Sequence, residues 1–438
     1  MAGGDISGEH PNPDLDPVGH AFLRWRRACL KVGWRPQLGA ERVGVAEAVS
    51  RVTAVPVHAR WSSPAHEVAA MDGIAVLATT TAGASETSPV LLSPGQFDPV
   101  DTGDPLSPGF DAVVMREHVQ YRDDGAVQLV APVTANRHVR CIGEDILVGE
   151  PLLPTGHRLR PIDVAVVAAA GHSDLMVREK PMIAILPTGD EVRPIGSALN
   201  RGEVLDTNSL MLAAYAREAG CATLMLPVER NDPSRITTAV SGIIDRADLV
   251  IIIAGTSSGR GDHTAAVLAG LGHVAVRGVA MRPGHPVILG LIHAPRPVPA
   301  IGAPGYPVSA AHVFETFAVP LIRLLLGTPI HERPTVRARL TQEVRSSPEI
   351  DEHVRIRLAR INDLARMDDL ARADGPAGEQ DHYAAIPVGK GAGALSSLMR
   401  ADGLLRIPAG SSGHAVGAEV VVELLRGAPI MAQAKDEH

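Results

Sequence analysis

Uninterrupted apolar runs separated by amphipathic stretches set the pattern of the second half of the chain. The runs at 182–186, 249–253 and 298–301 show no polar alternation, which is typical of parallel strands buried on both faces. A shorter strand at 204–205 is expected to lead into a helix after Asn208. A further helix follows the last run, and its apolar stripe keeps the 3.6-residue period at Phe314, Phe317, Ala318, Leu321, Ile322 and Leu325. This alternation predicts a mostly parallel α/β sheet whose ligands bind beyond the carboxyl ends of the strands.

Short apolar runs broken by Pro and Gly predict an inserted β-rich module in the first half of the chain. Its strands are expected at 89–92, 112–115 and 127–130. They lie in a segment that lacks the long apolar runs of the α/β region.

A similar β pattern returns after Gly327. The stretches VRIRLARI at 354–361 and EVVVEL at 419–424 flank a polar stretch at 367–380 that we interpret as a loop. We therefore expect residues 328–425 to form a small β-barrel.

Helical periodicity predicts two further helices. The first extends from about Val18 to Ala48 and is interrupted at Gly33, and the second, 161–170, has Pro at a first-turn position and is expected to pack with the first. The resulting division is a flexible arm at 1–15, a helical linker domain at 16–53 and 145–180, an inserted β-rich domain at 54–144, an α/β domain at 181–327 and a β-barrel domain at 328–438.

Composition narrows the class of protein. At 438 residues the chain is too long for one ordinary core, and with 45% hydrophobic but only 3% aromatic residues its cores must be built from Val, Leu, Ile and Ala. A formal net charge of -8 without a long Lys/Arg run argues against a nucleic-acid partner, so any anionic ligand must be held locally.

Cys29, Cys141 and Cys221 have no CxxC spacing, which predicts neither a disulfide framework nor a cysteine zinc site. With no secretory signal and no bilayer-length apolar run, we expect a cytoplasmic protein without a membrane partner.

The run DLVIIIAGTSSGRGDHTAAVLA at 248–269 joins a buried strand to a helix through a loop of small residues. Glycines let backbone N–H groups turn toward a ligand, hydroxyls add donors, and a helix start favours an anion. The residues concerned are Gly255, Ser257, Ser258, Gly259, Gly261, Asp262 and Thr264. The run predicts a phosphate or oxyanion seat, although a plain structural turn would use similar residues.

The motif Pro187-Thr188-Gly189-Asp190-Glu191 places two carboxylates and a hydroxyl at the rim of the sheet. Paired carboxylates repel an anion unless a cation lies between them, so the motif predicts Mg²⁺ shared with the phosphate oxygens of a nucleotide-like ligand. A capped turn before a helix is the alternative. Other loop acids, each more often a turn residue or a helix cap, are Asp72, Asp145 and Asp262.

Arginines in VRGVAMRPGHPVILG supply the opposite charge. Arg277 precedes a loop in which prolines hold Arg282 and His285, and a guanidinium on a rigid loop matches the geometry of a tetrahedral anion. A surface arginine beside a tight turn is the alternative.

A second narrow loop, 302–309, suggests close approach of backbone to ligand. The 18 histidines show no HExxH pattern, and no GxSxG elbow follows a strand, so neither a histidine metal site nor a serine triad is predicted.

Taken in order, these motifs resemble the molybdopterin molybdenumtransferase family, the MoeA type that includes the gephyrin E domain. The resemblance covers residues 15 to 425 or so. Its motifs are MDGIAV from Met71, DTGDPLSPGFDAVVMREHV from Asp101, IGEDI from Ile142, PTGDEV from Pro187, LDTNS from Leu205, AGTSSGRGDHT from Ala254, RPGHPVILG from Arg282, GAPGYPVSA from Gly302 and LSSLMRADGLLRIPAG from Leu395.

The resemblance implies an elongated homodimer of four-domain subunits, with an active cleft between the α/β domain of one subunit and the β-rich module of the other. Adenylylated molybdopterin and molybdate would bind there, and Mg²⁺-dependent cleavage of the phosphoanhydride would release AMP as the dithiolene takes up molybdenum. Transient partners would be a pterin adenylyltransferase and apo-molybdoenzymes.

The resemblance also assigns site residues by matching motifs. The catalytic residues would be Glu191, Asp262 and Asp72, and the metal ligands would be Asp145, Glu191 and Asp262. The substrate-binding residues would be Thr102, Asp190, Thr188, Gly255, Thr256, Ser257, Ser258, Arg277, Arg282, Pro283, Pro286, Pro304 and Tyr306.

The chain departs from the family pattern in its ligand loops. Ala254 stands where the family has Gly, Arg282 and His285 stand where it has Lys, and Ala303 and Tyr306 stand where it has Leu and Asn. Such changes keep a second function open, that of a non-catalytic pterin-binding or scaffold paralogue, and a related pterin adenylyltransferase is a third. A Tyr306 ring that fills the cleft would favour the paralogue, and a ring beside an open cleft would favour the enzyme.

Overall fold

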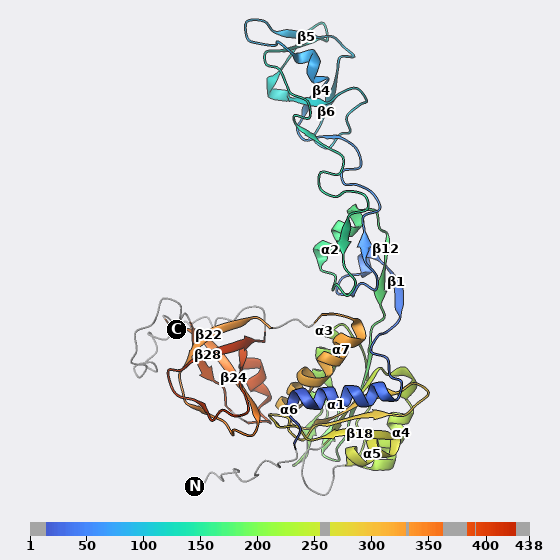
Figure 1. The fold of residues 1–438 in the computed structure, drawn as a ribbon, viewed down its shortest axis with the longest axis vertical. Coiled ribbons are helices and arrows are strands. Elements are labelled where there is room, and N and C mark those ends of the chain that lie inside the picture. The colour runs from blue at the N-terminus through green and yellow to red at the C-terminus, as the bar shows by residue number, and fades with distance from the viewer. Residues whose placement is uncertain (1–14, 255–262, 330–332, 362–382, 390, 426–438) are drawn as a thin grey trace. The chain divides into compact units, whose positions relative to one another are not determined.

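The computed structural model describes residues 15–254, 263–329, 333–361, 383–389 and 391–425 (Figure 1). Contacts divide the chain into two compact units, Met1–Leu38 with Lys180–His438, and Gly39–Glu179. The expected loop at 367–380 and, except for Leu15, the expected arm at 1–15 lie outside the described residues. The finer division into four domains stays a prediction.

A six-stranded sheet forms the centre of the first unit, with the order β16-β13-β17-β21-β20-β18. The strands are β16 (Ala222–Met225), β13 (Met182–Pro187), β17 (Leu249–Ala254), β21 (Val298–Pro304), β20 (Ile288–Ile292) and β18 (Gly272–Arg277). The first four are parallel, and β20 runs antiparallel to both of its neighbours. The predicted mostly parallel sheet is confirmed, because three apolar runs form its central parallel strands.

Helices cover this sheet where the sequence changes to helical periodicity. They are α1 (Val18–Lys31), α3 (Thr207–Glu218), α4 (Pro233–Ser241), α5 (His263–Leu271), α6 (Pro307–Val313) and α7 (Val319–Leu326), with a π-helical segment, Phe314–Ala318, between the last two. All six residues of the predicted apolar stripe are at most 1% exposed, which confirms that helix. The run Pro307–Leu326 has the length and hydropathy of a membrane span, but 67% of its apolar window is buried inside the protein, so the chain itself already covers this helix.

The expected helix from Val18 to Ala48 is wrong in its second half. Helix α1 ends at Lys31, Gly33 adopts a positive φ of 93°, and β1 (Ala40–Gly44) pairs antiparallel with β12 (Asp174–Arg178). The expected packing of the 161–170 helix with α1 stays a prediction, because the two helices belong to different units. Helix α1 contacts β18 and β20, and the Trp25 indole Nε1 donates to the Gly290 carbonyl at 2.6 Å.

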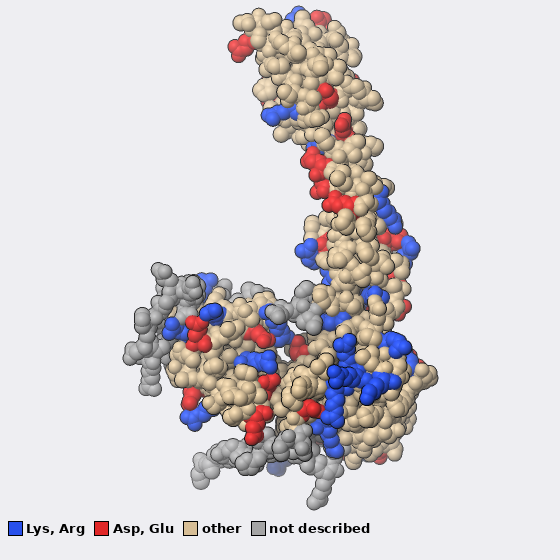
Figure 2. All heavy atoms as spheres, in the orientation of Figure 1, with Lys and Arg blue, Asp and Glu red and all other residues tan. Residues whose placement is uncertain are grey.

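Basic side chains gather over α1 (Figure 2). The helix carries Arg24, Arg26, Arg27 and Lys31 and no acidic residue. Helical spacing distributes these residues along the surface of the helix, while Trp25 faces the core, so a search for linear Lys/Arg runs misses the patch. The acidic chain thus carries a local basic surface.

Several elements of the α/β region differ from the prediction. The short strand β15 (Val204–Leu205) pairs with β14 (Val192–Arg193) outside the main sheet. The helix that follows begins at Thr207, where the Asp206 side chain accepts from Ser209 N at 3.0 Å. Strands β16, β18 and β20 and helix α4 were not predicted.

The C-terminal segment of the first unit is a closed β-barrel, as predicted. Its strands pair in the order β24-β25-β22-β28-β26, and β26 returns to β24. The elements are β22 (Thr335–Leu340), β24 (Asp351–Arg360), β25 (Tyr383–Pro387), β26 (Gly403–Ile407), β28 (Glu419–Leu424), the short pair β23 (Val344–Arg345) and β27 (Gly413–His414), and helix α9 (Leu395–Arg400). Strand β19 (Met281–Arg282) joins the edge of β24 in parallel.

The second unit is built from small antiparallel sheets, which confirms the expected β-rich texture. Besides β1 and β12 it contains β2 (Val57–His58), β3 (Val68–Ala69), β4 (Gly73–Val76), β5 (Val90–Leu92), β6 (Phe97–Val100), β7 (Ala112–Met115), β8 (Val119–Tyr121), β9 (Val127–Leu129), β10 (Val139–Arg140), β11 (Pro151–Leu153) and α2 (Pro161–Ala169). Strand β4 lies between β6 and β7, and β9 lies between β5 and β8. The predicted helix at 161–170 is present with Pro161 in its first turn.

The start of α2 depends on a buried carboxylate. Asp163 accepts from Arg160 Nη2 at 2.7 Å and from the Arg160 backbone N–H at 2.8 Å, and its Oδ2 lies 2.7 Å from His157 Nε2. The Arg160 guanidinium, helped by His157, holds the pKa of Asp163 well below its usual range. Because the folded pKa is depressed, this stabilisation is present above the unfolded pKa of about 4 and is lost as pH falls toward the folded pKa.

We therefore expect Asp163→Asn to destabilise the second unit by about 1–3 kcal/mol at neutral pH. The difference from the wild type should shrink as the pH is lowered below about 4. Hydrogen exchange of the α2 amides, corrected for the intrinsic rates, measures both effects. The exposed Asp123→Asn in the same unit is the control, and a difference that stays constant with pH would contradict the assignment.

Candidate functional site

A pocket of about 560 Å³ opens at the carboxyl ends of β13 and β17, where ligands of parallel sheets bind. Its size is in the usual range for a nucleotide-sized ligand. The lining residues are Pro187, Thr188, Glu191, Val192, Val204, Leu205, Asp206, Thr207, Asn208, Ile253, Gly305, Tyr306, Pro307, Gly393 and Leu395. Three predicted site residues, Thr188, Glu191 and Tyr306, therefore meet at one pocket.

The loop after β13 is fixed to the end of β17. The buried Thr188 donates from Oγ1 to the Ile253 carbonyl at 2.9 Å, so its hydroxyl ties two strands together. Gly189 has a φ of 147°, and a Cβ built there would lie 3.0 and 3.1 Å from the Glu191 carboxylate oxygens. Glycine at this position thus leaves room for the Glu191 carboxylate at the pocket rim.

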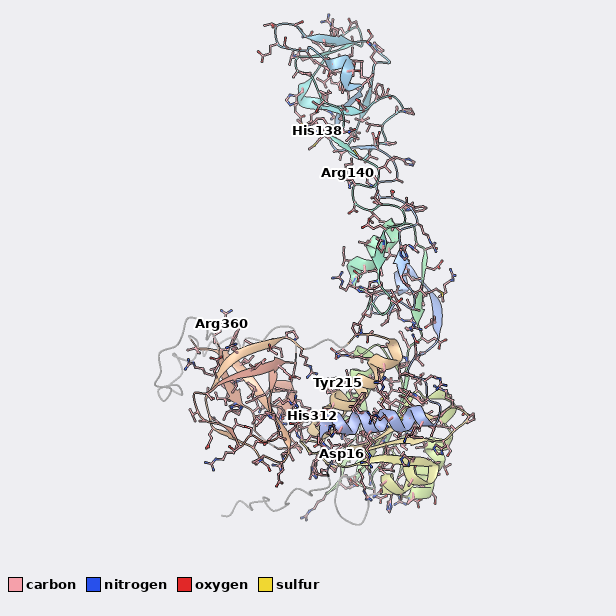
Figure 3. The ribbon with its side chains drawn as sticks, viewed as in Figure 1. Asp16, His138, Arg140, Tyr215, His312 and Arg360 are labelled. Atoms are coloured by element: carbon pink, nitrogen blue, oxygen red, sulfur yellow. The ribbon has the colours of Figure 1, made fainter. Side chains whose placement is uncertain are left out.

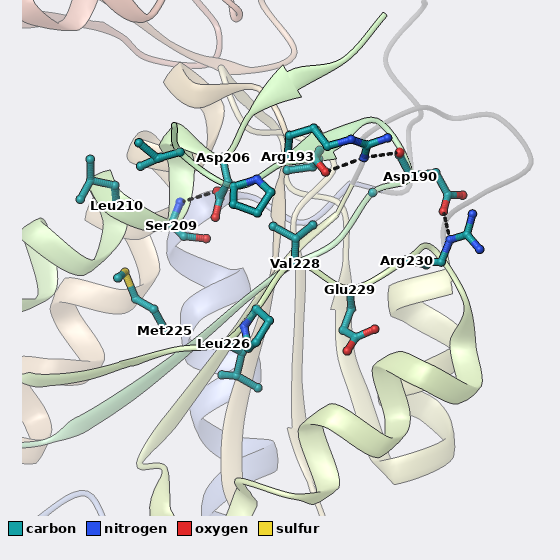
Figure 4. A pocket seen from close by; sticks show the side chains of 15 residues that line it. Asp190, Arg193, Asp206, Ser209, Leu210, Met225, Leu226, Val228, Glu229 and Arg230 are labelled. Atoms are coloured by element: carbon teal, nitrogen blue, oxygen red, sulfur yellow. Dashed lines mark hydrogen bonds and ion pairs between the residues drawn. The ribbon is translucent and has the colours of Figure 1, made fainter. Parts of the chain in front are cut away.

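The two adjacent carboxylates do not form the expected pair. Glu191 lines the pocket described above, whereas Asp190 lines a neighbouring pocket of about 610 Å³ between the β13 loop and the segment after β16 (Figure 4). There the Asp190 carboxylate accepts from Arg230 Nε at 3.2 Å, and its carbonyl accepts from Arg193 Nη1 at 2.8 Å. The two carboxylates therefore do not form a site that holds a cation between Asp190 and Glu191.

The first turn of α3 contributes two pocket residues that the site prediction missed. Asp206 caps the helix, and the buried Asn208 donates from Nδ2 to the Gly305 carbonyl at 2.7 Å, which positions the β21–α6 loop. Within the described chain, Asn208 Oδ1 is buried without a hydrogen-bond partner. The motif LDTNS contains Asn208 and could have identified it. Its partner Gly305, however, lies 97 residues later in the sequence, so the contact cannot be inferred from local sequence.

The Tyr306 side chain lies at the rim of the open pocket. Its side chain is 56% exposed, and it precedes α6 as the N-cap residue. A Cβ at Gly393 would lie 3.5 Å from the ring, so the ring packs beside the loop before α9. The ring does not fill the pocket.

Arg277 is placed at the ligand-binding edge of the sheet. Strand β18 runs in the same direction as β21 because β20 is antiparallel to both. Arg277 pairs with Ile288, which pairs with Gly302, and the same row continues to Ile252 in β17. The exposed Arg277 thus ends its strand in register with the carboxyl-terminal part of the parallel strands.

The other predicted residues of this unit are spread over separate surfaces. Arg282 pairs through its backbone with Glu352 on the barrel strand β24, and Pro283 lines a pocket at the barrel junction. Pro286 is exposed, and Pro304 is buried at the end of β21. The structure therefore does not gather these four residues around Glu191. The predicted residues Gly255, Thr256, Ser257, Ser258 and Asp262 lie outside the described residues.

In the second unit the structure brings Asp72 and Thr102 together. The Asp72 carboxylate accepts from the Thr102 backbone N–H and from Thr102 Oγ1, both at 2.8 Å. These donors, with Arg116 nearby, lower the pKa of Asp72, and the backbone hydrogen bond is the largest cause. Asp145 is exposed in the loop after β10.

We expect Thr102→Val to raise the pKa of Asp72 toward, but not fully to, its ordinary value, because the backbone N–H donor remains. A carboxyl-detected NMR titration of Asp72 measures this shift. Thr87→Val, in an exposed loop of the same unit, is the matched control. An unchanged Asp72 pKa in Thr102→Val would show that the hydroxyl contact does not act on the carboxylate.

Among the described residues no group of three or more His, Cys, Asp or Glu side chains could by itself hold a metal ion. Mg²⁺, however, commonly binds through one or two carboxylates and completes its coordination with water and substrate phosphates. The pocket offers the exposed Glu191 carboxylate and the capping Asp206, both hard oxygen donors. The residues present therefore fit Mg²⁺ shared with a substrate, and do not form an all-protein cage.

Comparisons with known proteins cover most of the chain. Three family models match: "MoeA N-terminal region (domain I and II)" over residues 20–171, "Probable molybdopterin binding domain" over 184–324 and "MoeA C-terminal region (domain IV)" over 370–425. Molybdopterin molybdenumtransferase 2 of Mycobacterium tuberculosis is 31% identical over 332 residues, covering 69% of this chain and 80% of the relative. Molybdopterin molybdenumtransferase of Nostoc sp. is 29% identical over 336 residues, covering 73% and 77%. The crystal structure of a molybdopterin biosynthesis MoeA protein from Pyrococcus horikoshii is 29% identical, covers 95% of this chain and 100% of its own, and has a TM-score of 0.77.

Proposed function

The chain belongs to the MoeA family, and we propose that it is a molybdopterin molybdenumtransferase that inserts molybdenum from molybdate into adenylylated molybdopterin with release of AMP. This activity belongs to molybdenum cofactor biosynthesis. The proposal rests on the similarity to molybdopterin molybdenumtransferases together with the pocket at the sheet edge.

The observation that carries the proposal is the position of Glu191. Its carboxylate stands at the rim of a nucleotide-sized pocket, on a loop whose Thr188 is hydrogen-bonded to β17. Asn208 holds the facing Gly305 loop in place. A rigid frame around one exposed carboxylate suits proton transfer or orientation of an attacking water.

Cleavage of the substrate would proceed by attack of water on the phosphoanhydride phosphorus. A bond forms between the water oxygen and that phosphorus, the bond from the phosphorus to the bridging oxygen breaks, and AMP leaves with the bridging oxygen. The pterin dithiol then displaces one oxygen of molybdate, which leaves as water with the two thiol protons, and two Mo–S bonds form without a change in oxidation state. Glu191 would orient the water and accept its proton, and the walls formed by Leu205, Ile253 and Tyr306 would limit access of bulk water. Arg277, at the same edge of the sheet, would attract the anionic substrates.

Mg²⁺ is part of this proposal. Glu191, with Asp206 nearby, would hold it jointly with substrate phosphate oxygens. When bound, it would neutralise charge on the phosphoanhydride. Without a cation, two carboxylates at one pocket would repel the substrate.

The Tyr306 geometry supports the enzyme over a non-catalytic paralogue, because the ring leaves the pocket open. MoeA domains match both before and after the molybdopterin-binding domain at 184–324. A pterin adenylyltransferase that consists of this domain alone is therefore not supported. A homodimer, a cytoplasmic location, and transient contact with a pterin adenylyltransferase and apo-molybdoenzymes remain parts of the proposal.

A reconstitution assay tests this function. Purified protein would be incubated with adenylylated molybdopterin, molybdate and Mg²⁺, and the product transferred to a metal-free apo-molybdoenzyme. Recovery of that enzyme's activity, abolished by EDTA and restored by added Mg²⁺, is the expected result. Failure to form transferable cofactor under any of these conditions would reject the proposal.

A further inference from the structure

Another pocket, of about 430 Å³, lies where the α6 and π-helical segment meets the outer face of the barrel. Pro283, Phe314 and Leu404 are among its apolar wall residues, and His312 and His353 among its polar ones. Figure 3 labels Tyr215 and His312 in this part of the first unit, and Tyr215 stacks on Phe314 with a centroid separation of 6.0 Å. None of the residues proposed to act on the phosphoanhydride lines this cavity.

Polar side chains enter the cavity from both elements. On β24 the residues 352, 354 and 356 face the barrel interior, so the alternating His353 and Arg355 face outward toward the helix. His312 comes from α6, and its ring centroid lies 4.2 Å from that of His353. Three nitrogen-bearing side chains thus converge at one junction.

These side chains are buried but incompletely hydrogen-bonded. His312 is 9% exposed and Arg355 is 4% exposed. In the part of the chain that the structure describes, His312 Nε2, His353 Nδ1 and Arg355 Nε are buried without a hydrogen-bond partner. Leaving a buried donor unpaired is costly, so three such atoms around one cavity indicate a place for acceptor oxygens.

The charges favour an anion as the source of those oxygens. Arg333 is paired with Glu315 at 2.6 Å, whereas the described contacts of the Arg355 guanidinium are to the Gly389 and Gly391 carbonyls, at 2.6 and 3.3 Å. Glu218, at the end of α3, is a second acid at the wall of the same cavity. Among the described residues the hydrogen-bond acceptors of the Arg355 guanidinium are backbone carbonyls, which carry no full charge, and a bound anion would neutralise its buried charge.

The pKa directions agree with a cationic surrounding. Burial, followed by Arg406, lowers the pKa of His353 to about 4. Burial, followed by His353, Arg333 and Arg355, lowers the pKa of His312 well below its usual range. Both rings are thus neutral near neutral pH, and each can donate one N–H to a ligand.

We propose that this cavity is a second ligand site, which binds a small organic anion with a carboxylate or phosphate head against His312, His353 and Arg355 and an apolar body against Phe314 and Leu404. The cavity volume fits a ligand of this kind. The site joins the α/β region to the barrel within one unit and is separate from the Glu191 pocket.

Isothermal titration calorimetry on the full chain tests the proposal with 2-naphthoate and 2-naphthyl phosphate as probes and the uncharged 2-naphthamide as their matched control. We expect saturable binding of at least one anionic probe with a Kd below about 1 mM, and at least about tenfold weaker binding of the amide. The anion that binds more tightly identifies the head group. Equal binding of the amide, or no saturable binding of either anion, would overturn the proposal.

Two variants and one spectroscopic measurement locate the site. His312→Phe should weaken anion binding by at least about tenfold, while His20→Phe, on the exposed side of α1, should not change it. In wild-type protein with labelled histidines, assigned through His353→Gln, the bound anion should raise the pKa of His353 by about one unit. This titration decides the question even if His312→Phe does not fold, because an unshifted His353 at saturating anion would place the binding elsewhere.

Discussion

Glu191→Gln is expected to lower the rate of molybdenum transfer by at least about 100-fold, because the amide can neither accept a proton nor bind Mg²⁺ as a carboxylate does. The Glu191 side chain is exposed at the pocket rim, so the free energy of unfolding should change by less than about 0.5 kcal/mol. Reconstitution of an apo-molybdoenzyme under single-turnover conditions measures the rate, and urea denaturation measures the stability.

The control for this prediction is Asp245→Asn, which removes an exposed carboxylate from the 3-10 turn Ile244–Arg246 of the same unit. It should leave the transfer rate unchanged. Full activity in Glu191→Gln would remove this residue from the chemistry, and a loss shared equally by Asp245→Asn would point to a nonspecific effect of charge.

Trp25→Ala should destabilise the first unit by about 3–5 kcal/mol, the largest stability effect predicted for a single substitution in this chain. Trp25 is fully buried, and its indole Nε1 donates to the Gly290 carbonyl in the sheet. The substitution removes the aromatic packing and leaves that carbonyl without its donor. Urea denaturation followed by far-ultraviolet circular dichroism measures the loss.

Leu23→Ala on the same helix is the matched control for Trp25→Ala, because Leu23 is 45% exposed whereas Trp25 is fully buried. It should change the free energy of unfolding by less than about 0.5 kcal/mol. A Trp25→Ala effect below about 1 kcal/mol would show that α1 is not anchored on the sheet through this side chain.

Local pattern predicted the centre of the fold well. The strands β13, β17 and β21 are buried on both faces, so each left an unbroken apolar run that needs no tertiary information. The predicted helix stripe at Phe314–Leu325 was found for the same reason. By contrast, β18 and β20 are separated by a loop rich in Pro and Gly, which concealed them.

The error at α1 has a different cause. Apolar spacing continued past Gly33, but the positive φ of that residue ends the helix, and β1 is formed because β12, more than 130 residues later, offers a pairing partner. Long-range pairing of this kind is absent from local periodicity.

The sequence predicted several residues of the site, but not which pocket each side chain lines. Thr188, Glu191 and Tyr306 were identified from motifs and do line one pocket. Asp190 was predicted from the same motif, yet the backbone at Gly189 and the ion pair with Arg230 place its carboxylate at a neighbouring pocket. Asn208 was missed because its role depends on a contact with Gly305 that only the folded chain creates.

The central claim is that adenylylated molybdopterin is cleaved in this protein as molybdenum is inserted. Single-turnover AMP release, measured with Mg²⁺ in the presence and absence of molybdate, tests it most directly. The account predicts that AMP is released only when molybdate is present and that Glu191→Gln abolishes the release. Tight binding of adenylylated molybdopterin without AMP release under either condition would contradict it and would identify a binding protein instead of a transferase.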